Sequence, residues 1–170
     1  MLFLNISNHP SNKWSEEQKS AALKLVADEE ACWDGMIIDI PFPAVSPNIG
    51  GDDIAKMADE VIDQIRRHFT KEIIQRLLTE PLPSPVIHVM GEMGLTFYLV
   101  DKLRALGFPC AHSTTERVVE EKPDGTKVSQ FRFVKFRFYV GTDKRGSYIG
   151  TLRQWEENIL SQERAAEARK

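Results

Sequence analysis

The stretch VIHVMGEMGLTFYLVDKLRALG, residues 86–107, decides the fold class. It opens with a short, mostly apolar run at 86–90, which is typical of a buried strand. Apolar residues then recur at helical spacing from Leu95 to Leu106, and Gly107 is suited to cap the end of that helix. The stretch therefore predicts a strand followed directly by an amphipathic helix.

The same order of patterns occurs earlier in the chain. Residues 2–6 and 36–40 are further short apolar runs, and Ser15, followed by acidic residues, marks a helix start between them. A helical period from Ile54 to Leu77 predicts one long helix that ends at the PLPSP joint. Strands that alternate with helices in this way predict right-handed crossovers and a parallel sheet.

Beyond Pro109 the pattern changes to a hairpin. A fourth strand is predicted through CAHSTTERVV, KPDGTK supplies a turn, and QFRFVKFRFYV alternates over a full strand length. Strict alternation places Phe131, Phe133, Lys135, Arg137 and Tyr139 on one face, and Arg132, Val134, Phe136, Phe138 and Val140 on the other. Because both faces are largely apolar, we expect this strand inside the sheet or against a partner subunit.

The predicted fold is α/β, a Rossmann-like open sheet that is mainly parallel, with a C-terminal β-hairpin and a terminal helix. We expect the Rossmann-like domain over residues 1–150 and the helix with its charged tail over 151–170. The length of 170 residues suits a single domain, and 42% hydrophobic with 28% charged residues excludes a disordered or fibrous chain. The net charge of -3 argues against duplex nucleic acid, so an anion site must be a local basic cluster.

Several other classes of protein are not expected. Cys32 and Cys110 lack the spacing of a zinc or redox motif, so we predict two buried thiols, no metal site and no cofactor. The N-terminus lacks the pattern of a signal peptide, and no run approaches the ~20 apolar residues that span a bilayer. We expect a cytoplasmic protein without membrane contact. His88 and His112 lie in predicted strands and are interpreted as satisfied interior histidines.

Ligands of open α/β sheets lie outside the carboxyl ends of the strands, and polar residues follow three predicted strands here. His9 precedes Pro10 on a loop, where it could contact a phosphate, act as a general acid-base or only cap a backbone group. Glu92 could satisfy backbone donors at a helix start or pair with Arg117. The motif GEMG matches neither the dinucleotide fingerprint nor the P-loop.

The segment STTER, residues 113–117, combines hydroxyls with a guanidinium, as phosphate recognition does. The alternative is a strand end tied by a salt bridge of Arg117. Lys135 and Arg137 fit both accounts, either as phosphate ligands or as partners of Glu116 and Glu120. The predicted catalytic residues are His9 and Arg117, and the predicted ligand-binding residues are Ser7, Asn8, Glu92, Ser113, Thr114, Thr115, Lys135 and Arg137.

With a first strand that ends in NISNHP, doubly wound βα units and a fourth strand that leads into STTER, residues 1–140 resemble the CRISPR-associated Rossmann-fold (CARF) domains. Members of that family are typically dimers that bind cyclic oligoadenylates across the two-fold axis, and some small relatives cleave the ring with the RNA's own 2′-hydroxyl. The resemblance implies a homodimer that binds a small nucleotide or cyclic oligonucleotide, as a standalone sensor or a metal-independent ring nuclease. Its ligand loops would contain Ser7, Asn8 and His9, and Thr114, Thr115 and Arg117.

Two other functions fit the same residues. A non-catalytic interaction module would use the basic strand VKFRF and its aromatic neighbours to meet a protein partner. An enzyme that acts on another phosphorylated small molecule would use the same strand-end pocket, because no residue pattern here specifies a reaction.

Overall fold

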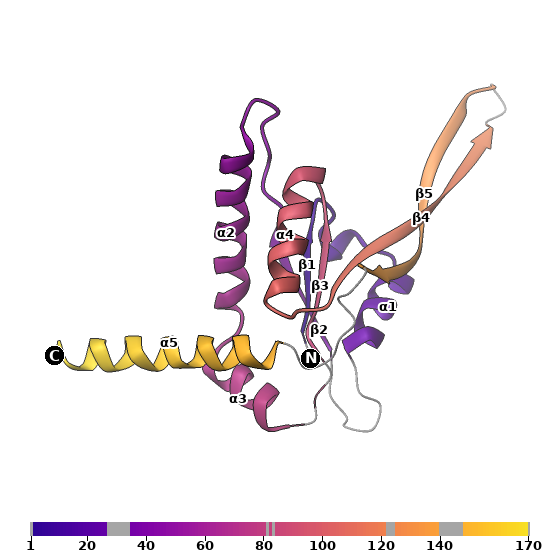
Figure 1. The fold of residues 1–170 in the computed structure, drawn as a ribbon. Coiled ribbons are helices and arrows are strands. Elements are labelled where there is room, and N and C mark those ends of the chain that lie inside the picture. Colours follow the sequence, from indigo (N-terminus) through magenta and orange to yellow (C-terminus); the bar gives the residue numbers. More distant parts are fainter. Residues whose placement is uncertain are drawn as a thin grey trace.

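The structure is a computed structural model that describes residues 2–26, 35–80, 82, 84–121, 125–139 and 148–169. Its elements are β1 (Leu2–Ser7), η1 (Ser11–Lys13), α1 (Glu16–Val26), β2 (Met36–Pro41), α2 (Gly51–Arg67), α3 (Lys71–Thr79), β3 (Val86–Met90), α4 (Met93–Ala105), β4 (Cys110–Glu121), β5 (Lys127–Phe138) and α5 (Ile149–Glu167). The predicted α/β class is confirmed (Figure 1). The predicted thiol of Cys32 lies outside the described residues.

The five strands form one sheet in the order β2-β1-β3-β4-β5. Both β2 and β3 run parallel to β1. Strand β4 is parallel to β3 over Ile87–Cys110 and His88–Ala111, and β5 returns antiparallel to β4. This is the predicted mainly parallel, Rossmann-like sheet with a C-terminal hairpin. The chain passes from β1 to β2 on one side and then crosses to β3 on the other, so the strand order reverses between β1 and β3.

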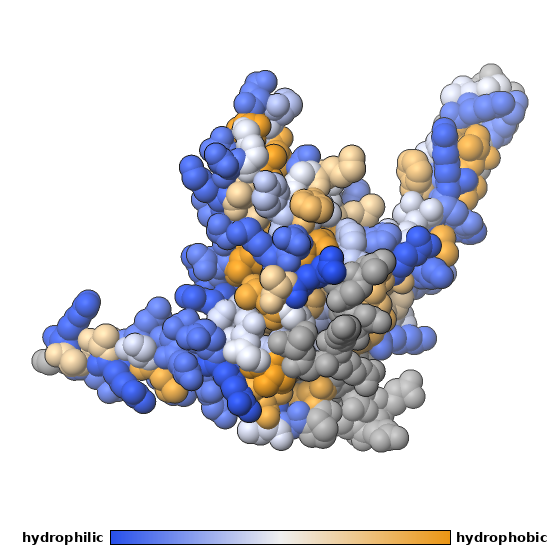
Figure 2. Space-filling model, viewed as in Figure 1, coloured by the Kyte–Doolittle hydropathy of each residue, from blue (hydrophilic) through white to orange (hydrophobic). Residues whose placement is uncertain are grey.

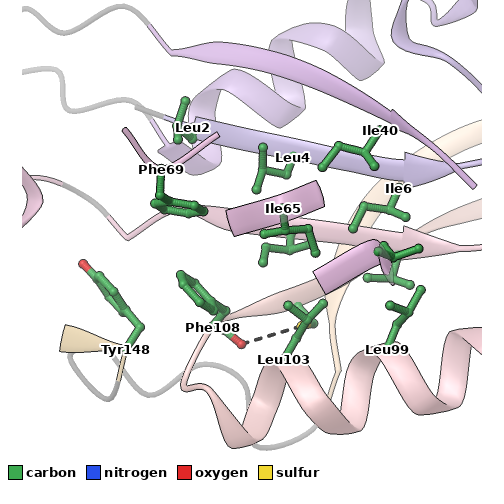
Figure 3. Close-up of a cluster of buried hydrophobic side chains, with 14 of the residues drawn as sticks. Leu2, Leu4, Ile6, Ile40, Ile65, Phe69, Leu99, Leu103, Phe108 and Tyr148 are labelled. Carbon is green, nitrogen blue, oxygen red and sulfur yellow. Dashed lines mark hydrogen bonds between the residues drawn. The ribbon is translucent and has the colours of Figure 1, made fainter. Parts of the chain in front are cut away.

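Helices cover both faces of the parallel strands, which is why β1 is apolar on both sides. Leu2, Leu4 and Ile6 point to one face and join a core with residues of α2 and α4, as Figure 3 shows. Phe3 points to the other face and packs with Trp14 and with α1. We call these the α4 face and the α1 face of the sheet.

The prediction of one long helix from Ile54 to Leu77 is wrong, because the chain turns between α2 and α3. Thr70 begins α3 as its N-cap, with its hydroxyl accepting a hydrogen bond from Ile73 N at 3.4 Å. Phe69 turns inward at the break and is only 1% exposed, with its ring 5.4 Å from that of Phe108. A buried side chain within the turn preserves the apolar period, so the period did not reveal the break.

The predicted terminal helix is confirmed as α5, which begins slightly earlier, at Ile149. Its first turns belong to the body of the molecule, because Leu152 and Trp155 are buried in the core of the α4 face. The Thr151 hydroxyl also donates to the Leu106 carbonyl at 2.8 Å. Residues 161–169 are all exposed.

Strands β4 and β5 continue past the sheet as a two-stranded arm, residues 112–121 and 127–138, which stands away from the body (Figure 1). Strand β5 lies at the edge of the sheet and most of its residues are exposed. The expectation that this strand lies inside the sheet is therefore wrong. Contact with a partner subunit stays a prediction.

A β-bulge in the arm overturns the predicted faces of β5. Lys135 pairs with Thr114 and Phe133 with Thr115, so Val134 is an extra residue without a partner. Because this residue resets the alternation, the rings of Phe133 and Phe136 come within 5.0 Å on one face. The α1 face carries Phe131, Phe133, Phe136 and Phe138, and the α4 face carries Arg132, Lys135, Arg137 and Tyr139.

We expect Thr70→Ala to lower the free energy of unfolding by about 1 kcal/mol, because the first turn of α3 loses its capping acceptor. Urea unfolding followed by circular dichroism measures this loss. Thr70→Ser keeps the hydroxyl and should retain most of the stability. Equal losses in both variants would show that the cap does not stabilise the break between the helices.

Candidate functional site

The reversal of strand order places the expected ligand position over the carboxyl ends of β1 and β3. Strand β1 ends at Ser7, which is buried, and continues into the exposed residues Asn8 and His9. Strand β3 ends at Met90 and leads through Gly91 to Glu92, which is exposed. Four of the predicted site residues therefore meet at this edge.

A buried amide holds the loop after β1. Asn5 is 1% exposed, and its Nδ2 donates to the His9 carbonyl at 3.0 Å and to Asp39 Oδ1 at 2.6 Å. Its Oδ1 accepts from Ser7 Oγ at 2.8 Å and lies 2.8 Å from His88 Nδ1. The amide thus makes all four hydrogen bonds of which it is capable. The loop backbone at His9 is fixed while its side chain stays in solvent.

His88 continues this network toward β4. Its Nε2 accepts from Ser113 N at 3.1 Å, so Nδ1 carries the ring proton and donates to Asn5 Oδ1. Burial, together with the smaller effect of positive charge on His112 and His9, lowers the pKa of His88 to about 3. His88 is therefore neutral at physiological pH, and its interpretation as a satisfied interior histidine is confirmed.

The polar row Asp39–Asn5–His88–Ser113 crosses β2, β1, β3 and β4. At its far end, Asp39 also accepts from Ser11, at 3.0 Å from the backbone N and 2.7 Å from Oγ. Sequence reasoning missed Asn5 and Asp39. Their signal is that one polar residue interrupts each of the apolar runs LFLNI, MIIDI and VIHVM.

Glu92 caps α4. Its Oε1 accepts from Gly94 N and its Oε2 from Leu95 N, both at 2.8 Å, and these hydrogen bonds lower the pKa of the carboxyl group. The interpretation that Glu92 satisfies backbone donors is confirmed. Each oxygen keeps acceptor capacity toward the solvent, so a ligand hydroxyl could still donate to it.

Two contacts shape the end of β3 around the cap. A Cβ atom at Gly91 would lie 2.5 Å from the Phe42 ring, so only glycine allows this ring to pack over the strand end. Ser113 Oγ lies 3.0 Å from the sulfur of Met90. Ser113 thus joins the predicted site residues at the edge of the sheet.

Lys135 and Arg137 flank this edge on the α4 face. Arg137 pairs with His112 and Lys135 with Thr114, whose hydroxyl donates to the Lys135 carbonyl at 2.9 Å. These pairs lie level with the end of β3, and two strand spacings put β5 about 10 Å to its side. Both cations are exposed, and neither forms an ion pair with another residue in the described part of the chain.

Arg117 does not join the group, and Thr115 pairs with Phe133 beyond the bulge, on the α1 face. Arg117 lies six residues past Ala111, the last residue that pairs with β3, which is about 20 Å along an extended strand. Its Nε donates to Ser129 Oγ at 2.6 Å rather than to Glu92. The expected pairing of Glu116 with Lys135 or Arg137 is wrong, because Glu116 accepts from Arg132 Nε at 2.7 Å. The side chain of Glu120 lies outside the described residues.

Other features of the chain bear on its class. Cys110 is buried, its thiol donates to the Phe108 carbonyl at 3.6 Å, and burial raises its pKa to about 12. Within the described ranges, no three His, Cys, Asp or Glu side chains come together closely enough to hold a metal ion. No helix in these ranges is both long and apolar enough to cross a membrane.

The buried His88 predicts a stability that falls as the pH is lowered below 6.5. The unfolded chain takes up a proton on this imidazole, while the folded chain resists protonation down to about pH 3. At about 1.4 kcal/mol per pH unit below the unfolded pKa, the loss between pH 6.5 and 5 is about 1 to 2 kcal/mol. Urea unfolding across this range measures it. His88→Gln should flatten the slope; equal slopes in wild type and His88→Gln contradict the assignment.

Asn5→Leu should cost about 2 to 4 kcal/mol of unfolding free energy, because the buried Nδ1–H of His88 is left without an acceptor, at about 1–3 kcal/mol, and the hydrogen bonds of the amide to Ser7 and Asp39 are lost as well. Asn8→Ala, an exposed change in the same loop, should stay within about 0.5 kcal/mol of wild type. Chemical unfolding at pH 7 compares the two. A small effect of Asn5→Leu would mean that the network does not hold the loop.

Comparisons with known proteins identify a family for this chain. No curated protein and no solved structure matches this chain. One protein family does match, over residues 1–137, which include all the strands of the sheet except the last residue of β5. By this match the chain belongs to the Uncharacterized protein MJ1673 family.

Proposed function

We propose that this chain binds a nucleotide over the carboxyl ends of β1 and β3, and that the ligand is a cyclic oligoadenylate. The observation that carries the proposal is the reversal of strand order at this point, where open α/β sheets bind their ligands. The exposed residues Asn8 and His9 lie there on a loop that Asn5 fixes. A fixed loop lowers the entropy lost on binding.

Lys135 and Arg137 are the proposed phosphate ligands. They share the α4 face of the arm, level with the end of β3, while the aromatic side chains of β5 point to the other face. An Arg guanidinium offers a fork of donors to a phosphate, and Lys adds a point charge. Such a local cluster is what a chain of net charge -3 needs in order to hold an anion.

In the enzymatic version, a ribose 2′-hydroxyl attacks the neighbouring phosphorus. The bond from phosphorus to the 5′-oxygen breaks, and a 2′,3′-cyclic phosphate forms. His9 takes the proton of the 2′-hydroxyl and gives it to the departing 5′-oxygen, and Lys135 and Arg137 stabilise the charge on the phosphoryl oxygens. Arg117 lies too far along the arm to act on the same phosphate within one chain. The homodimer that the CARF resemblance implies would have to supply it from the second copy.

A protein-interaction module is the second candidate function. The α1 face of the arm leaves Phe131 71% and Val119 53% exposed, and exposed apolar side chains that cluster favour contact with a partner. The same surface would serve the proposed homodimer. If a partner meets this face, Phe131→Ala weakens partner binding, whereas charge reversal at Lys135 or Arg137, which lie on the α4 face, leaves it intact.

Calorimetry of the purified chain with cyclic tetra-adenylate and cyclic hexa-adenylate tests the nucleotide proposal. The double variant Lys135→Ala with Arg137→Ala should weaken binding at least tenfold, because two phosphate contacts are lost. The control is Arg67→Ala, which removes an exposed cation at the end of α2. It should leave the affinity within about twofold, since a distant surface charge contributes little in physiological salt.

Chromatography of the bound ring separates the sensor from the ring nuclease. If the chain cleaves the ring, His9→Ala should slow cleavage by about 100-fold or more while binding changes little. Binding without cleavage assigns a sensor. Absence of binding to either ring overturns the proposed ligand.

A further inference from the structure

Two apolar side chains at the start of α4 are left in solvent. Met93 is 83% exposed and Phe97 is 70% exposed. They lie four residues apart, so they share one face of the helix and stand one above the other. Met93 follows directly on Glu92, at the carboxyl edge where the ligand is proposed to lie, and Phe97 lies one turn further along α4.

This exposed pair is confined to the end of α4 at the site. On the same outward side, the next positions along the helix are Asp101 and Arg104, which are charged and exposed. The inward side of the helix packs in the core, where Leu99 and Leu103 are fully buried (Figure 3). Figure 2 shows apolar surface at this end of α4 among hydrophilic atoms. The pair is therefore not the margin of the hydrophobic core.

The size of the pair indicates what covers it. A stable protein partner needs about 800 Å² and roughly 20 to 30 residues on each side. Two side chains next to the exposed polar residues Asn8, His9 and Glu92 do not supply that area. A single heterocycle can be held by one aromatic ring. The Tyr98 ring meets Phe97 edge-on, at 80° and 6.1 Å between centroids, which supports the Phe97 ring on one side.

We propose that Met93 and Phe97 are the surface on which the nucleobase of the ligand stacks. This inference rests on the proposed nucleotide-binding function and adds the part of the site that recognises the base. Glu92 lies between this surface and the end of β3, and its carboxylate oxygens can accept a hydrogen bond from a ribose hydroxyl. The phosphates then extend toward Lys135 and Arg137, so the base, the ribose and the phosphates of a nucleotide each contact a different group of the site.

Two ligands separate base recognition from phosphate recognition: cyclic tetra-adenylate, and inorganic tripolyphosphate as an anion without a base. Phe97→Ala should weaken binding of the cyclic nucleotide about tenfold or more, because loss of base stacking costs about 1–3 kcal/mol. It should leave tripolyphosphate binding unchanged. Lys135→Ala should weaken both ligands. Phe97→Tyr keeps a ring and should restore the wild-type affinity for the cyclic nucleotide.

Arg104→Ala, on the same outward side of α4, is the matched control and should leave the affinity for the nucleotide unchanged. Thermal unfolding checks that the variants are folded, which is expected because Phe97 is exposed. If wild type binds the cyclic nucleotide and Phe97→Ala binds it equally well, the stacking surface is overturned and the nucleotide site stands. If wild type binds neither ligand, the proposed function itself fails.

Discussion

The amide of Asn5 is the contact on which the rest of the site depends. It is buried between three strands, and it links the loop after β1 to Asp39 of β2 and to His88 of β3. His88 in turn accepts a hydrogen bond from the backbone N–H of Ser113, where β4 leaves the parallel strands. A polar group in an apolar sheet is costly unless every donor and acceptor is paired, and here each one is. The network therefore admits one arrangement of the strand ends.

The arm contributes the second constraint. A single extra residue, Val134, puts the phenylalanines of β5 on one side and Arg132, Lys135 and Arg137 on the other. Phe136 anchors the aromatic side in the body, with its ring 5.1 Å from Phe3 and 5.8 Å from Trp14. Anchoring that face turns Lys135 and Arg137 toward α4. The bulge and the polar row thus have a common effect, since both determine how the arm joins the parallel strands.

Much of the fold could be predicted from local patterns. The runs at 36–40 and 86–90 form β2 and β3 almost to the residue, because short apolar runs between turn residues are typical of strands. The break at Thr70 escaped prediction because Phe69 keeps the apolar period through the turn. At the site, Ser7, Asn8, His9, Glu92 and Ser113 were predicted and lie at one edge of the sheet. Arg117 was predicted beside them and lies out on the arm.

The sequence by itself determined the α/β class, the hairpin and the strand ends at which polar residues gather, since these follow from periodicity and turn chemistry within short segments. Only the tertiary structure decided the strand order, the pairing of Asn5 with Asp39 and His88, and the face on which each residue of β5 lies. Those features depend on contacts between segments far apart in the chain. A one-residue change of register, such as the one at Val134, turns every later side chain to the opposite face.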